Sequence, residues 1–227
     1  MKILIVSATI AELQPLFNAL KITVNKSNRV YHSEYSGHTI TIMITGVGMV
    51  ATAYHLGGIQ KEDFDIALNA GIAGSFSKEL PVGQLVNVAS DFFAELGADY
   101  GDKFVPLADL DFGNEYSEKF ITKNGEIQNH TTTVNLVINK LKKVRGITVN
   151  TINGEETRIK KVTELFAPDV ESMEGAAFLY GCLKKDLPCF QLRTISNYIE
   201  PRNLNNWNIP FAIANLNKQL LEIIAAF

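Results

Sequence analysis

The sequence predicts an α/β protein: one domain of three layers, α/β/α, with helices on both faces of a mixed, largely parallel central sheet. Residues Lys2 to Ala8 form an apolar run rich in β-branched side chains, which is typical of a strand buried on both faces. Similar runs alternate with segments of helical spacing, as in parallel strands joined by helices. The chain has 227 residues, the length of one α/β domain, so we expect a single domain over residues 1–227.

The N-terminal half alternates between the two kinds of segment. Ser36 and Gly37 separate two strand-like runs, which indicates a β-hairpin. The segment Gly71-Ile72-Ala73-Gly74 follows a short strand. We expect strands at residues 2–8, 29–35, 38–44, 65–69 and 84–89, and helices at residues 10–20 and 48–57.

The C-terminal half begins with residues 91–128, which are aromatic and acidic without a clear period. We expect this segment to be a long connection between core elements. Beyond it the apolar spacing again alternates between the two patterns. We expect helices at residues 132–143, 155–166, 175–185 and 208–226, and strands at residues 146–152, 170–172 and 188–195.

The composition argues against several classes of partner. The net charge is -3 and the 21 basic residues form no block, so we expect neither nucleic acid nor a membrane surface as a partner. No stretch approaches the roughly 18 apolar residues of a membrane span, and the N-terminal apolar run is too short for a secretion signal. Cys182 and Cys189 lack metal-ligand spacing and are interpreted as free thiols, so we expect a cytoplasmic protein without a metal site.

A glycine motif after the third expected strand is similar to a dinucleotide-binding fingerprint. Gly46-Val47-Gly48-Met49-Val50-Ala51 follows a strand and opens a helix. That fingerprint also needs an acidic residue at the end of the next strand, to bind a ribose. Here Asp65 lies at the start of that strand and Asn69 at its end. We therefore expect the glycines to serve a tight turn and close helix packing, and we expect no nicotinamide or other cofactor.

Polar side chains lie at the ends of several expected strands, where open α/β proteins bind ligands. Glu12 follows the first strand, Glu174 lies where a strand gives way to a helix, and Ser196-Asn197 follow an apolar strand. Taken singly, each has an ordinary explanation. Glu12, for example, is an acid in a first helical turn, which the helix dipole favours. Their succession at strand ends is what indicates a site.

The set of Glu12, Gly71-Ile72-Ala73-Gly74, Met173-Glu174-Gly175-Ala176-Ala177 and Ser196-Asn197 resembles the nucleoside phosphorylase/nucleosidase superfamily over nearly the whole chain. Residues 171–178 and 195–203 look most similar to hydrolases that cleave methylthioadenosine and adenosylhomocysteine and, more closely, to futalosine hydrolases. The resemblance implies the fold of that superfamily. It also implies hydrolysis of the N-glycosidic bond of futalosine, which releases hypoxanthine and dehypoxanthine futalosine in menaquinone biosynthesis.

The resemblance implies roles for individual residues. Glu12 matches the carboxylate that orients and deprotonates the attacking water, Glu174 the carboxylate that binds the ribose hydroxyls, and Met173 the side chain beneath the sugar. Further substrate contacts are implied at Ala8, Gly71, Ile72, Arg158 and Ser196.

Asn197 stands where the adenine-specific members have an aspartate. An ionised aspartate has no proton for O6 of a 6-oxopurine, whereas an asparagine amide can donate to O6 and accept from N7–H once N7 is protonated. A mismatched buried pair costs about 1–3 kcal/mol, enough for a preference of about 10–100-fold. We therefore expect Asn197 to act in catalysis and to favour a hypoxanthine or guanine leaving group. An asparagine that only caps a strand end is the alternative.

Water is favoured over phosphate as the attacking group. The phosphorylases of the superfamily hold phosphate with arginines, one of them just before the glycine segment, where this chain has Ala67-Leu68-Asn69. The loop from Ser7 to Glu12 has no arginine either, and Ile72 stands where a hydroxyl residue is common. Because phosphate without arginines is poorly compensated, we expect hydrolysis.

The resemblance places the pocket for the ribose 5′ substituent at Thr9, Val47 and Trp207. Trp207 could face an aryl group of the substrate, or it could be a core anchor at the start of a helix. A carboxylate on this substituent would need a cation, for which Arg202 is the first candidate and Lys103 the second.

Several alternatives stay open. The protein could be another purine nucleosidase, acting on methylthioadenosine, adenosylhomocysteine or inosine. A non-catalytic nucleoside-binding protein and a dinucleotide-dependent oxidoreductase rank below it. How the base is stacked is open, because Thr157 occupies the place of the aromatic residue of the adenine-specific members. A homodimer is implied by the resemblance, and the aromatic segment from Asp91 to Leu96 could complete the partner's pocket or pack internally.

Overall fold

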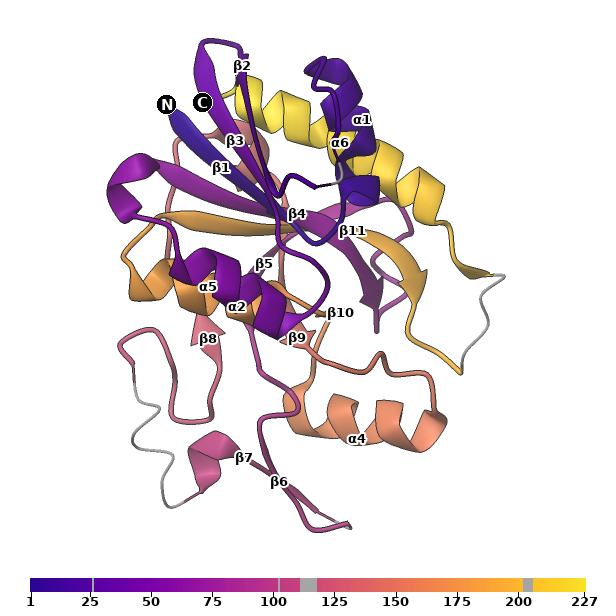
Figure 1. Ribbon diagram of the computed structural model, residues 1–227. Coiled ribbons are helices and arrows are strands. Elements are labelled where there is room, and N and C mark those ends of the chain that lie inside the picture. The colour runs from indigo at the N-terminus through magenta and orange to yellow at the C-terminus, as the bar shows by residue number, and fades with distance from the viewer. Residues whose placement is uncertain (26, 102, 111–117, 202–205) are drawn as a thin grey trace.

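A mixed β-sheet with helices on both faces forms the body of the protein (Figure 1). The computed structural model describes residues 1–25, 27–101, 103–110, 118–201 and 206–227. The strands of the main sheet are β1 (Lys2–Ser7), β2 (Val30–Tyr35), β3 (His38–Ile44), β4 (Ile66–Ser75), β5 (Leu85–Asp91), β8 (Ile127–Gln128), β9 (Lys142–Thr148), β10 (Val170–Ser172) and β11 (Cys189–Tyr198). The α-helices are α1 (Ile10–Ala19), α2 (Met49–Gly57), α3 (Leu136–Asn139), α4 (Glu156–Phe166), α5 (Gly175–Lys184) and α6 (Ile209–Ala225).

The strand order across this sheet is β10-β9-β5-β11-β4-β1-β3-β2, and β8 pairs with β5 outside that path. β1 lies in parallel between β3 and β4, and β4 continues in parallel to β11. Antiparallel pairs join β2 to β3, as the expected hairpin requires, and β5 to β11. The predicted α/β class with a mixed, helix-covered sheet is confirmed.

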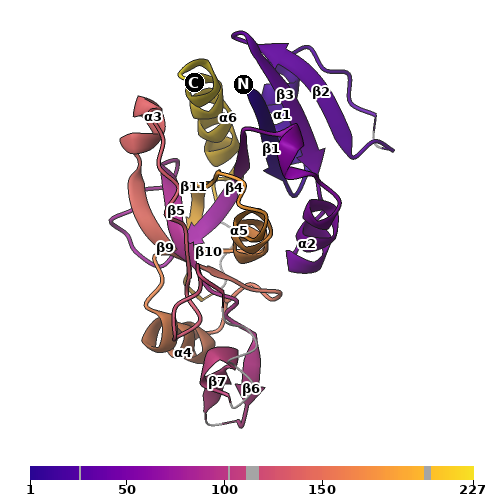
Figure 2. The same ribbon diagram turned by 90° about the vertical axis from the view of Figure 1, so that its left-hand side faces the viewer.

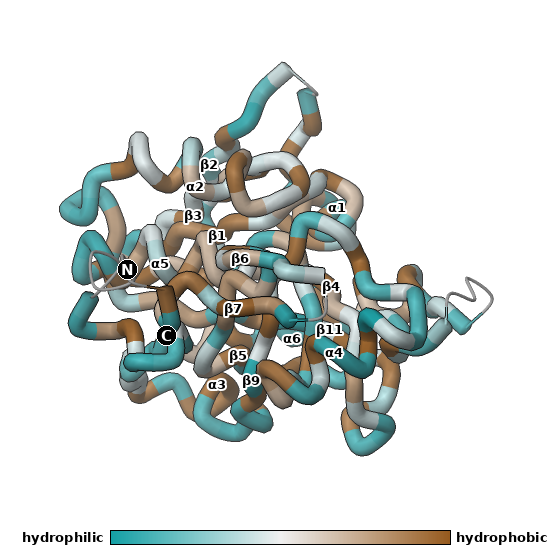
Figure 3. Tube along the Cα trace, turned by 90° about the horizontal axis from the view of Figure 1, so that it is seen from below, coloured by the Kyte–Doolittle hydropathy of each residue, from teal (hydrophilic) through white to brown (hydrophobic). Residues whose placement is uncertain are grey.

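Alternate side chains of β1 face two different apolar layers. Ile3 and Ile5 pack in a core with α1, α3 and α6, while Leu4 and Val6 pack in a second core with α2 and α5. Figure 2 shows α6 and α5 on opposite sides of the central strands. The loops that project from the body are largely hydrophilic, and apolar residues gather along the strands (Figure 3). This is the two-sided burial that an all-apolar strand predicts.

Two central strands are longer than the sequence indicates. β4 does not end at Asn69 but continues through the glycine segment to Ser75, and β11 continues past Ile195 to Tyr198. The reason is mutual pairing, because β11 follows β4 in parallel register to Tyr198 opposite Ser75. One register shift, between Ile195 and Asn197, interrupts the ladder. The glycines are therefore part of a buried strand and not of a loop.

The expected helix at residues 132–143 is wrong, and the expected strand at residues 146–152 is shifted. Only Leu136–Asn139 is helical, and β9 already begins at Lys142 and ends at Thr148. The side chain of Asn135 caps the short helix by accepting from the N–H groups of Val137 and Ile138. Val134 and Leu136 are exposed, so the apolar spacing here does not mark a buried helical face.

The connection at residues 91–128 contains more regular structure than the sequence indicates. It forms a small hairpin of β6 (Gly97–Asp99) and β7 (Phe104–Pro106) and the strand β8, while residues 111–117 lie outside the described part. Phe92 and Ala94 pack in an internal apolar cluster with Phe166 of α4. Of the two uses considered for the segment from Asp91 to Leu96, these residues have the internal one. Within the described residues, no helix has both the length and the apolar character of a membrane span.

Helices α1 and α6 are joined by an unusual hydrogen-bonded contact. Pro15 lies inside α1, where its ring opposes regular helix geometry. The side chain of Asn217, on α6, inserts there: its Oδ1 accepts from Leu16 N (3.1 Å) and its Nδ2 donates to Glu12 O (2.8 Å). The amide thus bridges the two backbone groups that an uninterrupted helix would pair directly. This contact fixes the helix that carries Glu12 against α6.

We expect Asn217→Leu to lower the free energy of unfolding by about 2–4 kcal/mol, because it leaves one buried N–H and one buried C=O without a partner. Urea unfolding followed by circular dichroism measures the loss. Pro15→Ala, added to Asn217→Leu, should restore part of it, since the helix can then close the bond between Leu16 and Glu12. A loss below about 1 kcal/mol in the single variant would contradict this account.

Candidate active site

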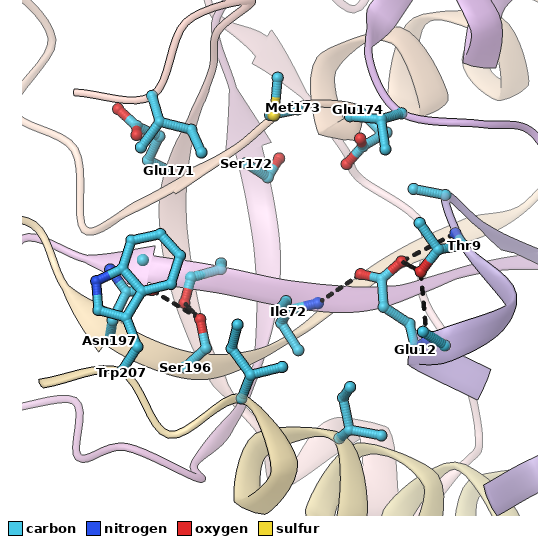
Figure 4. A pocket seen from close by; sticks show the side chains of 18 of the residues that line it. Thr9, Glu12, Ile72, Glu171, Ser172, Met173, Glu174, Ser196, Asn197 and Trp207 are labelled. Atoms are coloured by element: carbon cyan, nitrogen blue, oxygen red, sulfur yellow. Dashed lines mark hydrogen bonds between the residues drawn. The ribbon is translucent and has the colours of Figure 1, made fainter. Parts of the chain in front are cut away.

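A cavity of about 290 Å³ opens where β1, β4, β10 and β11 end. Figure 4 shows that Glu12 and Thr9 lie at one end of it and Asn197 and Trp207 at the other, with Met173 and Glu174 across from Ile72. The sequence-predicted residues that line this cavity are Ala8, Thr9, Glu12, Val47, Ile72, Met173, Glu174, Ser196, Asn197 and Trp207. Residues from distant parts of the chain therefore meet at one end of the sheet, as the strand-end argument predicts.

Glu12 belongs both to the first turn of α1 and to the cavity. Thr9 caps the helix, and Glu12 Oε2 accepts from Thr9 N (3.1 Å) and Thr9 Oγ1 (3.0 Å). Its other oxygen, Oε1, accepts from Ile72 N of β4 (3.2 Å). The carboxylate is thus held between a helix start and a strand, which leaves it little freedom to rotate. The ordinary capping role and the role in the site are compatible.

Glu174 immediately precedes α5, and the glycine motif binds its carboxylate. Gly48 N donates to Glu174 Oε1 (2.9 Å) at the start of α2. Gly46 and Gly48 have φ angles of 91° and 98°, which favour glycine. The motif therefore makes a tight turn whose free amide binds this carboxylate. Burial raises the pKa of Glu174 above its usual value, and the nearby Arg193 together with the Gly48 bond offsets part of the rise.

Arg193 is a functional candidate that sequence reasoning missed. Its side chain is 2% exposed, and its Nη2 lies 2.5 Å from Asn69 Oδ1 and 3.8 Å from Glu174 Oε2. A Cβ atom at Gly71 would lie 2.3 Å from Arg193 Nη1 and 2.9 Å from Glu12 Oε1, so only glycine fits there. Gly71 thus lies behind the cavity wall. The available signal was a lone charge inside the apolar strand that precedes Ser196.

The register shift in β11 places two consecutive side chains at the cavity. Successive side chains of a regular strand point to opposite faces, whereas both Ser196 and Asn197 line the cavity next to the shift. Ser196 Oγ lies within donating distance of Asn197 Oδ1 (2.8 Å), and Asn197 Nδ2 donates to Tyr198 O (3.1 Å). One amide hydrogen and one lone pair of Asn197 remain for a ligand.

The profile of the phosphorylase superfamily matches residues 2–227. The chain belongs to the phosphorylase superfamily. It is 30% identical over 159 residues to the futalosine hydrolase of Streptomyces coelicolor, which covers 67% of this chain and 62% of that one. It is 29% identical over 202 residues to the aminodeoxyfutalosine nucleosidase of Campylobacter jejuni, which covers 87% of this chain and 86% of that one.

Solved structures share the fold of this phosphorylase-superfamily chain. The 5′-methylthioadenosine/S-adenosyl homocysteine nucleosidase of Helicobacter pylori matches with a TM-score of 0.80. The match covers 100% of this chain and 99% of the other at 18% identity. At that identity the likeness supports the architecture, and the choice of substrate rests on the residues of the site.

The basic residues that the sequence suggested as substrate contacts are, where the structure describes them, not found in the lining of the first cavity. Arg158 lines a second, adjoining cavity, where its Nη2 donates to Glu95 Oε1. Lys103 is exposed beside the β6–β7 hairpin and does not line the first cavity. Arg202 falls outside the described residues.

Among the residues that the structure describes, no group of three histidine, cysteine or acidic side chains could hold a metal ion. Cys182 and Cys189 are free and buried, as expected.

The charges around the first cavity disfavour the binding of a phosphate. Two carboxylates, Glu12 and Glu174, face one guanidinium, Arg193, so this group carries an excess of negative charge when all three are ionised. Within the described residues, Arg193 is already paired with Glu174, so a phosphate entering here would meet the two carboxylates at close range. Water carries no such penalty.

A hydrogen-bonded group beneath α5 supports the turn at Glu174. Asp91 is buried and accepts from Gln191 Nε2 (3.0 Å) and Thr148 Oγ1 (3.0 Å). Thr148 Oγ1 in turn accepts from Ala176 N (2.7 Å), in the first turn of α5. Burial is the main cause that raises the pKa of Asp91, to about 7. Sequence reasoning did not identify this group, because three separate strands supply its side chains.

The raised pKa of Asp91 predicts a pH-dependent stability. Between about pH 4 and pH 7 the folded chain keeps a proton that the unfolded chain releases, so this contribution to stability is complete below pH 4 and falls as the pH rises to 7. Asp91→Asn removes the titration. The free energy of unfolding of the variant minus that of the wild type should therefore rise by roughly 3 kcal/mol over this window, measured by urea unfolding at several pH values.

The exposed carboxylate Asp186 provides a control for this measurement. Its pKa is lowered by Lys119, so Asp186→Asn should show no such rise between pH 4 and pH 7. A difference between Asp91→Asn and the wild type that stays constant over the window would refute the assignment.

Proposed function

We propose that the protein hydrolyses the N-glycosidic bond of futalosine and releases hypoxanthine and dehypoxanthine futalosine. The observation that carries the proposal is the position of Asn197: a side-chain amide at the opposite end of the cavity from the fixed carboxylate of Glu12. A ribose beside Glu174, between these two ends, would present C1′ to a water at Glu12 and the base to Asn197. Relatives named futalosine hydrolase and aminodeoxyfutalosine nucleosidase support the substrate class.

Glu12 is the general base of the proposed reaction. Its two oxygens are oriented by Thr9 and Ile72, so a lone pair can be directed at a water near C1′. As the C1′–N9 bond breaks, positive charge grows on the ribose and negative charge on the base. Glu174 binds the ribose hydroxyls, and its carboxylate also stabilises the developing positive charge. Water adds to C1′, and its proton passes to Glu12.

Asn197 acts on the leaving base. As the base departs, N7 takes a proton from solvent water, because the amide of Asn197 has none to transfer. The free N–H of Asn197 then donates to O6 of hypoxanthine, and its carbonyl accepts from N7–H. Ser196 Oγ, beside Asn197 Oδ1, favours the amide orientation that this requires. These bonds fit the departing base better than the bound nucleoside, as catalysis needs. Adenine carries an amino group in place of O6. In the same orientation of the Asn197 amide, the N–H donor of Asn197 would therefore face another donor.

The nearest alternative is another purine nucleosidase, acting on methylthioadenosine, adenosylhomocysteine or inosine. A non-catalytic nucleoside-binding protein would use the same cavity without turnover. The fixed geometry of Glu12 favours the enzyme over the binding protein.

A homodimer and a cytoplasmic location complete the proposal. Val50 and Tyr54 stand one turn apart on α2 and are 82% and 79% exposed, an apolar face that a second copy would cover. Val47, just before α2, is also exposed and lines the cavity, so a partner on this face would narrow the 5′ side of the site. Two free buried thiols suit a reducing compartment.

The decisive test is the identity of the products. Futalosine, inosine and methylthioadenosine are each incubated with the protein, with and without phosphate, and the base and sugar are identified by chromatography. We expect hypoxanthine and dehypoxanthine futalosine from futalosine at a rate independent of phosphate. Glu12→Gln should lower this rate at least about 100-fold while futalosine still binds in calorimetry. A phosphorylated sugar would contradict hydrolysis, and faster release of adenine from methylthioadenosine would favour the alternative.

We expect Asn197→Asp to lower the rate of hypoxanthine release about 10–100-fold and to raise any release of adenine, because the ionised carboxylate cannot donate to O6. The ratio of kcat/KM for futalosine and methylthioadenosine measures the change. Ser196→Ala is the matched control, since it removes the group that orients the amide but keeps the donor and the acceptor. Because the freed amide can turn, this variant should also lower the ratio, but by less than Asn197→Asp does. An unchanged ratio in Asn197→Asp would refute the role of this residue.

A further inference from the structure

The cavity adjoins a second one of about 250 Å³, and the two share three lining residues, Ile152, Asn197 and Trp207. The rest of the second cavity is lined by Asn153, Gly154, Glu155, Arg158, Tyr198 and Glu200. The junction therefore brings together one hydrogen-bonding amide and two apolar side chains. A purine needs this combination, because its edges form hydrogen bonds while its flat faces contact apolar groups.

The chain on both sides of Trp207 is tied to the end of β11. Asn208 N donates to Ser196 O (2.9 Å), and Asn206 Nδ2 donates to Glu200 Oε1 (2.6 Å). The side chain of Asn208 also caps α6 by accepting from Phe211 N (3.3 Å). These bonds hold the chain on both sides of Trp207, and the indole lies beside Asn197, at the end of the cavity away from Glu12 and Thr9 (Figure 4).

Thr157 does not supply a stacking surface. It lies in the first turn of α4, where Glu155 caps its backbone N–H, and it lines neither of the two adjoining cavities. The apolar surface at the junction comes from the indole of Trp207 and the aliphatic side chain of Ile152.

We propose that Trp207 is the stacking platform of the purine base, in place of the 5′-pocket role expected from the sequence, with Ile152 as the second apolar wall. The inference rests on the proposed function for the identity of the base. Trp207 then determines how well the base is bound, and Asn197, held next to it, determines which base fits. An indole stacks on adenine and hypoxanthine alike, so the stacking and the base preference can be separated by experiment.

The single tryptophan of the chain makes a direct test possible, because all tryptophan fluorescence comes from Trp207. The full-length protein is titrated with hypoxanthine, with adenine and with dehypoxanthine futalosine, which carries the 5′ substituent but no base. We expect hypoxanthine to quench the emission and dehypoxanthine futalosine to leave it unchanged. Quenching by dehypoxanthine futalosine alone would overturn the proposal in favour of the 5′ pocket.

Variants separate stacking from a structural role. We expect Trp207→Leu to weaken hypoxanthine binding in calorimetry roughly 10-fold or more, and Trp207→Phe to retain it within about 3-fold. Both should leave the affinity for dehypoxanthine futalosine within about twofold. Phe211→Leu is the matched control, an aromatic-to-leucine change nearby on α6 that lines neither cavity, and it should not alter base binding. Wild-type affinity for hypoxanthine in Trp207→Leu would overturn the proposal.

The titration also distinguishes a wrong assignment of the substrate from a failure of the stacking proposal. Quenching by adenine but not by hypoxanthine would support stacking by Trp207 while contradicting the assigned base. If neither base quenches the emission at concentrations up to several millimolar, the stacking proposal itself is wrong, whatever products the chromatography identifies.

Discussion

The buried guanidinium of Arg193 is the constraint on which the rest of the cavity depends. A charge taken out of water is costly unless a counter-charge and hydrogen bonds compensate it. Glu174 supplies the counter-charge and Asn69 the hydrogen bond. Because the side chain also fills the space over Gly71, β4 can carry no side chain at that position. One residue thus accounts for the glycine at position 71 and supplies the counter-charge of the buried Glu174.

The fixed groups of the site are supported from different sides of the sheet. Glu12 is held by the start of α1 and by β4, while Glu174 is held by a glycine turn at the start of α2. The register shift in β11 directs Ser196 and Asn197 into the same space. No single element forms the site, so its geometry depends on the whole sheet staying intact. This suits a reaction in which small displacements of the reacting groups are expensive.

Sequence reasoning located the fold class and most of the cavity lining, because both depend on local patterns. The all-apolar β1 and the Ser36-Gly37 turn have direct signatures, and polar residues at strand ends gather where parallel strands end. It failed where the outcome depends on packing between distant segments. The spacing at residues 132–143 resembles a helix, yet pairing of β9 with β5 and β10 draws its last residues into the sheet.

The same limit applies to the buried polar groups. Arg193 and Asp91 lie in or beside apolar strands, and only the assembled sheet shows what they contact. A sequence gives the identity of such residues but not their partners. The position of Trp207 belongs to this class too, since its neighbours are hydrogen-bonded to Ser196 of β11 and to Glu200 just after that strand.

The amide of Asn217 that bridges α1 joins residues 205 positions apart in the chain. The backbone hydrogen bonds of α1 are completed by a side chain of α6, so local folding of the α1 segment alone cannot complete this helix. The bond from Ile72 N to the Glu12 carboxylate is long-range as well, so the fixed direction of this carboxylate depends on contacts between segments far apart in the chain. The Asn217 contact also couples local unfolding of α1 to local unfolding of α6 in the native state. Amide hydrogens around Leu16 would then exchange with solvent through a large cooperative unit and not by fraying of the helix end.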